Sequence, residues 1–195
     1  MAKRNPRMYV ILLRGINVGG KNLVSMAKLQ STLSNLGFTN VSTYIASGNV
    51  ILASDKPADE IKNQIEKALI QHFTLDSKLI KVLVLNRKQL QSVVDHKPKG
   101  FGEQPEQYHS DVIFMMDINV TQAMSAFDPR EGVDTIWPGG GVIYSQRLSA
   151  KRTKSRLSKV MASPHYKSMT IRTWNTTLKL LKMLKDADPS KATTD

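Results

Sequence analysis

Residues 8 to 22 read MYVILLRGINVGGKN, an apolar run that breaks into a glycine-rich loop just after Arg14. The run from Tyr9 to Leu13 has the length and the β-forming composition of a strand. Because its apolar residues are consecutive rather than alternating, we expect a strand that is buried on both faces of its sheet. This stretch therefore predicts a central strand, on which later elements pack, and a polar loop at one end of it.

The loop has the composition of an anion-binding turn. Glycines tolerate positive φ, so the backbone there can present N–H groups to a ligand. The candidate ligand-binding residues in this loop are Arg14, Gly15, Asn17, Gly19, Gly20 and Lys21. A guanidinium matches phosphate or carboxylate with two hydrogen bonds, which favours Arg14, although an internal ion pair or a cap on carbonyls would also explain it. Asn17 could contact a ligand or close its own turn.

The same loop matches the G-x-x-x-x-G-K pattern of nucleotide-binding P-loops, and VIFMMD at 112–117 resembles the strand whose Asp holds magnesium. Three features oppose that interpretation. Asn22 lacks the metal-binding hydroxyl, the next helix is expected at Ser25 rather than at the lysine, and a hairpin follows that helix instead of a parallel strand. We expect a loop that binds phosphate without hydrolysing a nucleotide.

The first half of the chain predicts the element order β-α-β-β-α-β. After the first strand we expect a helix capped by Ser25 and ended by Gly37, strands over 41–46 and 50–53, a helix that starts near Pro57, and a strand over 80–85. The hairpin turn Ser47-Gly48-Asn49 supplies two further ligand candidates, Ser47 and Asn49. A turn-closing role is favoured for Asn49.

The second half predicts the same element order, which we interpret as an architectural duplication. It predicts strands over 111–116, 133–137, 142–146 and 169–172, a helix over 121–127, a basic helix over 155–161 and a final helix over 174–185. The fold class is thus α+β, with two ferredoxin-like β-α-β-β-α-β repeats and an extra C-terminal helix. We expect a first repeat over 1–86, a helix and linker over 87–108, a second repeat with the last helix over 109–185, and a polar tail over 186–195.

The charge is strongly positive and unevenly placed. The net charge is +12, and residues 147 to 185 contain eleven Lys or Arg and no Asp or Glu. Such a field attracts nucleic acid, acidic membrane surfaces and phosphorylated small molecules, although a basic face can also serve solubility alone. We expect a basic rim formed by Lys151, Arg152, Lys154 and Arg156.

Near the C-terminus, Thr173 can cap the last helix, whose apolar stripe starts with Trp174. We expect Trp174 in the core rather than as a platform that stacks bases. Arg172, Asn175 and Lys179 remain near the positive N-terminal end of the helix and complete the set of ligand candidates.

Several chemistries have no support in the sequence. The chain has no cysteine, which excludes disulfides, thiolate metal sites and thiol nucleophiles and fits a reducing compartment. No apolar run approaches the roughly 20 residues of a membrane span, and we find no signal peptide, so a cytoplasmic protein without membrane contact is expected. The four histidines lack metal-ligand spacing, and we expect no metal and no cofactor. No catalytic residue is identified, which leaves enzyme activity open.

Four segments carry a resemblance to a known family: RGINVGGKN, SMAKLQSTLSNLGF, TYIASGNVI and TIRTWNTTLKLLKML. With them the chain resembles the family catalogued as domain of unknown function 1697, whose members are mostly bacterial. The resemblance implies an α+β fold of two ferredoxin-like repeats and implies no activity. The family pattern falls on Arg14, Gly15, Asn17, Gly19 or Gly20, Ser47, Gly48, Asn49, Arg172, Trp174, Asn175, Thr176 and Lys179.

These observations leave three functional hypotheses. The first is a protein that binds a phosphate-bearing ligand, with nucleic acid foremost, over the Arg14 loop and the basic C-terminal half. The second is an enzyme or sensor for a nucleotide or acidic metabolite, and the third is an interaction module without a ligand. The first two predict that Arg14 and Arg172 converge on one pocket. The sequence leaves the oligomeric state open.

Overall fold

The computed structural model describes residues 5–76 and 80–187. The chain divides into two compact units, of which the first comprises Met1–Leu90 and Lys179–Asp195 and the second Gln91–Leu178. We predicted boundaries at residues 86 and 108, whereas this division places the end of the last helix in the first unit. The predicted tail from residue 188 onward lies outside the described residues.

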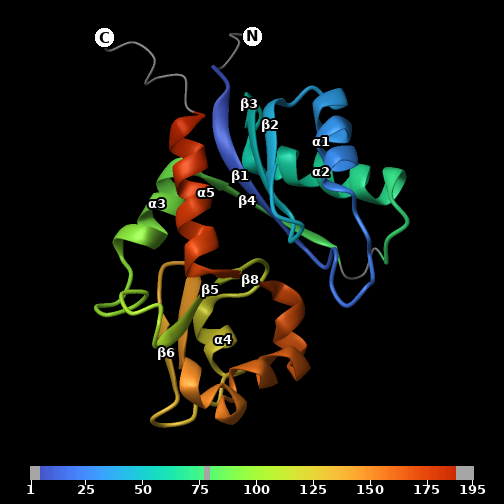
Figure 1. The fold of residues 1–195 in the computed structure, drawn as a ribbon. Helices are drawn as coiled ribbons and strands as arrows, with labels where there is room; N and C mark the ends of the chain where they lie inside the picture. The colour runs from blue at the N-terminus through green and yellow to red at the C-terminus, as the bar shows by residue number, and fades with distance from the viewer. Residues whose placement is uncertain (1–4, 77–79, 188–195) are drawn as a thin grey trace, which may run out of the picture. The chain divides into compact units, whose positions relative to one another are not determined.

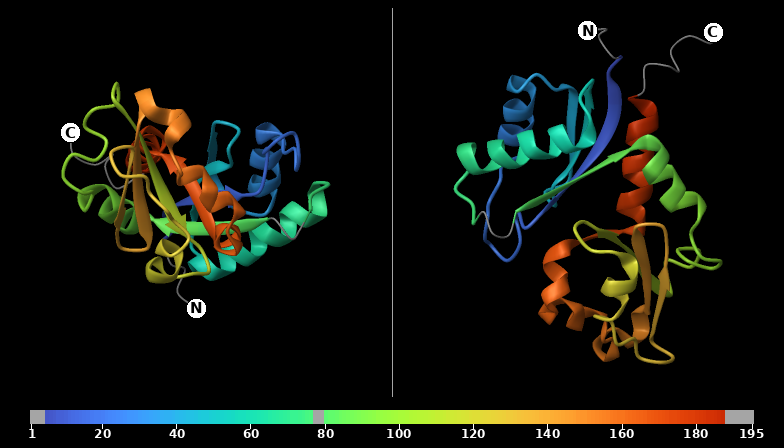
Figure 2. Two further views of the ribbon diagram at one scale, coloured as in Figure 1. Left: turned by 90° about the horizontal axis from the view of Figure 1, so that it is seen from below. Right: turned by 180° about the vertical axis from the view of Figure 1, so that it is seen from behind.

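The first unit contains a four-stranded antiparallel sheet with the strand order β2-β3-β1-β4. Helices α1 and α2 cover one face of this sheet (Figures 1 and 2). Its elements are β1 Arg7–Arg14, α1 Met26–Asn35, β2 Thr39–Tyr44, β3 Asn49–Ser54, α2 Ala58–His72 and β4 Lys81–Asn86.

Strand β1 is the centre of this unit, as its apolar run predicted. Val10, Ile11 and Leu12 are fully buried, so both faces of the strand are covered. Ser25 caps α1 by accepting a hydrogen bond from the Lys28 backbone N–H at 3.3 Å, as expected. The predicted strand and helix order of the first half is confirmed.

The second unit repeats the strand order, here β6-β7-β5-β8, again fully antiparallel. The α+β class is therefore confirmed. The boundaries of this unit fall within two helices, α3 Arg87–Asp95 and α5 Trp174–Asp186. The elements between them are β5 Tyr108–Met115, α4 Val120–Met124, β6 Asp134–Pro138, β7 Val142–Leu148, three 3₁₀-helices, η1 Ser149–Lys154, η2 Leu157–Ala162 and η3 Pro164–Ser168, and β8 Met169–Thr173.

The basic α-helix predicted over 155–161 is wrong, because this segment forms 3₁₀-helices instead. Ser155 and Ser163 have extended backbone angles and separate the three short turns. The buried residues of η2, Leu157 and Val160, are three positions apart, which suits the threefold period of a 3₁₀-helix. The helix predicted over 121–127 is also shorter, and β5 begins at Tyr108 rather than at Asp111.

The segment predicted as a linker contributes to the core of the second unit. Phe101 is fully buried and makes edge-on ring contacts with Trp137, Tyr144 and Trp174, at centroid distances of 6.0, 5.1 and 5.2 Å. The Tyr144 hydroxyl donates to the Val93 carbonyl at 2.7 Å. Trp174 is thus a core residue, as expected, and an aromatic cluster anchors the segment between α3 and β5.

Within the described ranges, no helix combines the length and the apolar character that crossing a bilayer requires.

Candidate functional sites

The glycine-rich loop of the first unit is closed by its own asparagines. The Asn17 amide donates to the carbonyls of Val24 and Ala46 at 3.0 and 2.8 Å, and its oxygen accepts from the Val24 N–H at 2.8 Å. The Asn22 amide donates to the Gly15 carbonyl at 2.7 Å. Both residues have positive φ, near 50°. Asn17, left open between two roles, therefore closes the loop.

The hairpin turn lies against this loop. The Leu13 N–H donates to the Gly48 carbonyl at 2.8 Å. A Cβ on Gly48 would lie 2.8 Å from Leu13 Cβ, and its φ is +80°, so only glycine suits this close approach. The buried Asn49 amide donates to the Tyr44 carbonyl and to Ser47 Oγ. The sequence motifs at 14–22 and 47–49 are thus brought together, and Asn49 has the turn-closing role that was favoured.

The remaining candidates of this loop differ in exposure. Arg14 ends β1 opposite Lys81 and is half-buried, whereas Lys21, Gly19, Gly20 and Ser47 are exposed. The Lys21 backbone N–H donates to the Val18 carbonyl, which occupies a group that a P-loop would offer to phosphate. Helix α1 starts at Met26, as expected. These bonds favour a closed polar turn over a nucleotide-binding loop.

In the second unit, the edge of β5 forms part of a pocket. Pairing between β5 and β8 begins at Asp111 and Thr173, so the first residues of β5 extend past the end of β8. A pocket of about 170 Å³ lies in this notch, which we call the edge pocket. Its wall includes Tyr108, His109, Ser110, Thr173, Trp174 and Asn175.

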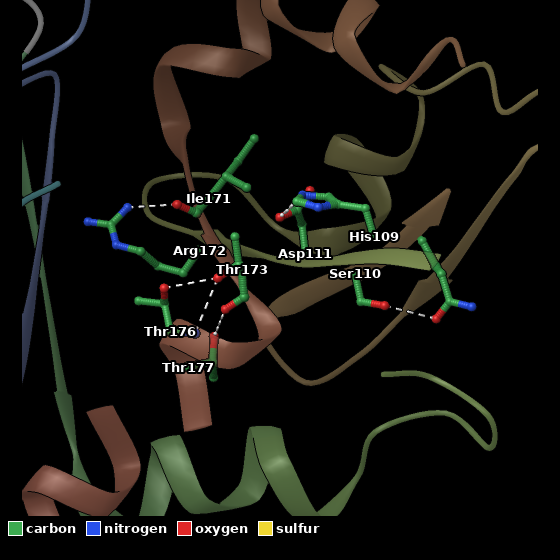
Figure 3. A network of polar contacts seen from close by, with 9 residues as sticks. His109, Ser110, Asp111, Ile171, Arg172, Thr173, Thr176 and Thr177 are labelled. Carbon is green, nitrogen blue, oxygen red and sulfur yellow. Dashed lines mark hydrogen bonds and ion pairs between the residues drawn. The ribbon is translucent and has the colours of Figure 1, made fainter. Parts of the chain in front are cut away.

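A histidine–carboxylate pair stands at the edge pocket. His109 Nε2 lies 3.1 Å from Asp111 Oδ1, because two residues apart on a strand they share a face (Figure 3). Burial raises the pKa of Asp111, while His109 and then Arg147 oppose that shift. Ser110 points to the other side of the strand and donates to Gln146 Oε1 at 3.1 Å. The pair holds the His109 ring through one nitrogen and leaves Nδ1 for another partner.

Asp134 forms a second buried acidic group in this unit. Burial alone would raise the pKa of Asp134, but the backbone N–H groups of Arg156 and Arg130 and the Ser155 hydroxyl outweigh it, and the pKa lies below its usual value. Among the described residues, the buried side-chain atoms without a hydrogen-bond partner are Asp134 Oδ1 and Arg147 Nε. Asp134 thus joins β6 to the two loops that supply those N–H groups.

The three C-terminal candidates lie in different environments. Arg172 is buried in β8 and donates to Thr170 Oγ1 at 2.9 Å. It also donates to the Ile171 carbonyl at 2.8 Å (Figure 3). Loss of solvent lowers its pKa to about 10, so Arg172 remains cationic at neutral pH. Asn175 and Lys179 are exposed, and only Asn175 lines the edge pocket. Arg14 and Arg172 belong to different units, and their predicted convergence stays a prediction.

The four residues of the predicted basic rim differ, because one of them forms an ion pair and the other three are exposed. Lys151, Arg152 and Lys154 are exposed in η1. Arg156 is half-buried and donates from Nη1 to both carboxylate oxygens of Asp128, at 3.2 and 3.0 Å. The rim therefore presents its positive charge through η1, while much of the Arg156 charge is neutralised internally.

Sequence reasoning missed the His109–Asp111 pair. We gave no histidine a metal-binding or catalytic role, and the predicted strand started at Asp111, which left His109 outside it. A His-x-Asp pattern within a strand places both side chains on one face, and this signal could have found the pair. Among the described residues, no cluster of three or more His, Cys, Asp or Glu could hold a metal ion.

Fold and site together define a basic α+β protein with two antiparallel four-stranded sheets of the same strand order. The chain belongs to the family described as "Protein of unknown function (DUF1697)", whose model matches residues 7–144. The expected family membership is thereby confirmed. The C-terminal segment with Arg172 and Asn175 lies beyond the matched range.

A solved structure shares this architecture. The chain is similar to the "conserved bacterial protein SP0830 from Streptococcus pneumoniae", with 25% sequence identity and a TM-score of 0.79. The similarity covers 92% of this chain and 99% of that chain, so it extends over both units. No curated protein matches the chain.

Proposed function

We propose that the protein binds the phosphate backbone of nucleic acid through residues 149–168, the three 3₁₀-helices η1 to η3, which we call the basic segment. The observation that carries this proposal is a set of exposed cations with little internal neutralisation. The segment contains six Lys or Arg and no acidic residue. Five of the six are exposed: Lys151, Arg152, Lys154, Lys159 and Lys167.

Internal contacts of these cations are few. Asp128 lies within ion-pair distance of Arg156 and, at 3.8 Å, of Lys159. Within the part of the chain that the structure describes, the Lys151 side chain contacts the Gly132 carbonyl, at 3.5 Å. Arg152, Lys154 and Lys167 have no side-chain partner among the described residues. Release of counterions from phosphates therefore favours association with a polyanion.

The aromatic residues near the segment favour backbone contact over base reading. Tyr144 is fully buried beneath Phe101, and Tyr166 is half-buried. Base stacking on exposed aromatic rings, which single-strand binding proteins use, therefore has little basis here. Phosphate contacts carry no sequence information, so we expect binding to be largely independent of sequence and strongly dependent on salt.

The test is fluorescence anisotropy with labelled single-stranded RNA and double-stranded DNA over a series of salt concentrations. The variant combines Lys151→Glu, Arg152→Glu and Lys154→Glu. We expect wild-type protein to bind at low salt, and the variant to lose about three units of the slope of log affinity against log salt.

A matched control carries Lys67→Glu, Lys88→Glu and Lys99→Glu. These lysines are exposed and lie outside the basic segment. Their substitution lowers the net charge by the same amount as the triple substitution in η1. The control should keep most of the wild-type affinity. No binding at low salt, or an equal loss in both variants, would contradict the proposal.

We also propose that each unit is a ferredoxin-like repeat. Support comes from the strand order β2-β3-β1-β4, which recurs as β6-β7-β5-β8 with the same antiparallel pairing. In the second repeat, η1 to η3 take the position of the second helix. The exposed cations of the basic segment thus lie where the fold otherwise packs a helix.

A further inference from the structure

The edge pocket contains hydrogen-bond donors whose partner is missing. Trp174 is 6% exposed and lines the pocket. Its indole nitrogen donates to none of the described residues. Among the described residues, the fully buried side-chain atoms without a partner are Asp134 Oδ1 and Arg147 Nε. The indole nitrogen is not one of them, so it keeps access to solvent. A buried donor that meets solvent only at a pocket wall is suited to a ligand with acceptor oxygens.

The position of the indole ring shows that its nitrogen lies at the pocket wall. A Cβ on Gly102, which also lines the pocket, would lie 2.5 Å from Trp174 Nε1. The nitrogen-bearing edge of the ring therefore lies at the Gly102 side of the pocket wall. Phe101 holds the ring by an edge-on contact at 5.2 Å between centroids. The donor is thus fixed in place before any ligand binds.

Further polar groups line the same pocket. The Tyr108 hydroxyl and the exposed Asn175 amide have no hydrogen-bond partner among the described residues, and His109 engages only Nε2. Thr173 Oγ1 caps α5 by accepting from the Thr176 N–H at 3.2 Å. The first turn of α5 therefore directs its positive end toward the pocket, which favours an anion.

Charge and size restrict the ligand. Asp111 pairs with the wall residue His109 at 3.1 Å and also interacts with Arg147. Glu106, which follows the wall residue Pro105, is exposed. Glu103, near Gly102, is occupied by Lys97 at 2.8 Å. A volume of about 170 Å³ lies below the roughly 300 to 1,000 Å³ of typical small-molecule pockets. That space suits one small oxygen-rich group rather than a nucleoside.

We propose that the edge pocket is a binding site for a small oxyanion, a carboxylate or a phosphate group, which accepts hydrogen bonds from Trp174 Nε1 and the Asn175 amide. None of the wall residues belongs to the basic segment. The site is therefore independent of the proposed nucleic-acid function, and either can fail without the other.

The experiment is NMR spectroscopy of the tryptophan indole N–H groups. The chain has two tryptophans, so two indole signals are expected, and Trp137→Phe assigns them. Sodium phosphate, sodium acetate and sodium chloride are titrated separately into protein held in an amine buffer. We expect a saturable downfield shift of the Trp174 signal with phosphate, acetate or both, and little change with chloride or at Trp137.

Two variants test the assigned contacts. Asn175→Ala removes an exposed side chain and should raise the apparent Kd about tenfold, which corresponds to one lost charge-assisted hydrogen bond. Asn63→Ala, an equally exposed asparagine on α2, should leave the Kd unchanged. The triple variant of η1 should also keep the wild-type titration.

Each outcome decides the proposal. A response to phosphate alone or to acetate alone supports the site and names its ligand class. An unmoved Trp174 signal, the same shift with chloride, or the same Kd in Asn175→Ala and wild type would overturn it.

Discussion

The two sheets have the same strand order but are covered differently. In the first unit, α1 and α2 provide ten and fifteen residues of α-helix with continuous apolar stripes. In the second unit, α4 has five residues and the second helix position holds three 3₁₀-helices. Long helices supply apolar surface, so the second unit must anchor its connections by other means.

The two units also differ in how their polar side chains are bonded. In the first unit, the asparagines of the loop and hairpin donate to backbone carbonyls and close their own turns. In the second unit, Asp134 and the Trp174 indole are buried, and Asp134 Oδ1 and Arg147 Nε are buried atoms without a partner among the described residues. The comparison teaches that the asparagines of the first unit are used for structure, while the second unit leaves some polar atoms without a partner among the described residues.

The largest loss of stability is expected when the aromatic cluster of the second unit is disrupted. Phe101→Ala removes a fully buried ring that contacts Trp137, Tyr144 and Trp174. We expect a loss of about 3 to 5 kcal/mol in the free energy of unfolding, measured by urea denaturation. Phe101→Leu should cost clearly less. Wild-type stability in Phe101→Ala would show that the segment between α3 and β5 is a linker after all.

A smaller effect is expected at the hairpin of the first unit. Gly48→Ala places a Cβ within 3 Å of Leu13 and Ile16 at φ +80° and should cost about 2 to 4 kcal/mol. Gly19→Ala also has positive φ, but its Cβ would meet nothing within 4 Å, so it should cost only about 1 to 2 kcal/mol. Equal losses in urea denaturation would contradict the close approach of hairpin and loop.

The pH dependence of stability tests the role of the buried Asp134 carboxylate in the second unit. Asp134→Ala leaves the N–H groups of Arg130 and Arg156 unpaired and should cost about 1 to 3 kcal/mol at pH 7. Because folding lowers the pKa of Asp134, its stabilisation is present above the ordinary value of 3.8 and is lost as the pH falls through the folded-state pKa. The two stability curves should therefore converge in acid. A constant difference down to low pH would rule out a role for the charge.

The smallest effect is expected for the surface ion pair. Asp128→Asn weakens the contact between Asp128 and Arg156, whose side chains are 60% and 37% exposed. We expect a loss of about 0.2 to 1 kcal/mol that disappears at high salt. The same variant frees positive charge beside the basic segment, so nucleic-acid affinity should rise slightly in the anisotropy assay. A fall in affinity would place Asp128 in the binding surface.

The local architecture was largely predictable because its signals are local. The apolar run of β1, the Ser25 cap and the hairpin turn each depend on a few adjacent residues. The roles of the asparagines were only partly predictable, since Asn17 donates to Ala46, which is far from it in sequence. The basic 3₁₀-helices were missed because a short apolar pair, Leu157 and Val160, fits an α-helix as well.

The site of the second unit could not be predicted for a different reason. The burial of Arg172 depends on the pairing of β8 with β5, which sequence spacing does not reveal. The edge pocket exists because β5 continues beyond Thr173, and the predicted strand started three residues too late to show it. Long-range pairing thus decides which cations are buried and which polar groups meet at the pocket.

The most direct test of the division between the two units is an NMR titration with a short oligonucleotide, followed at the backbone amide signals. We predict that the signals that shift are concentrated in residues 149–168, and that those of residues 15–22 and 46–49 stay in place. Shifts centred on the glycine-rich loop, with an unchanged basic segment, would contradict the account.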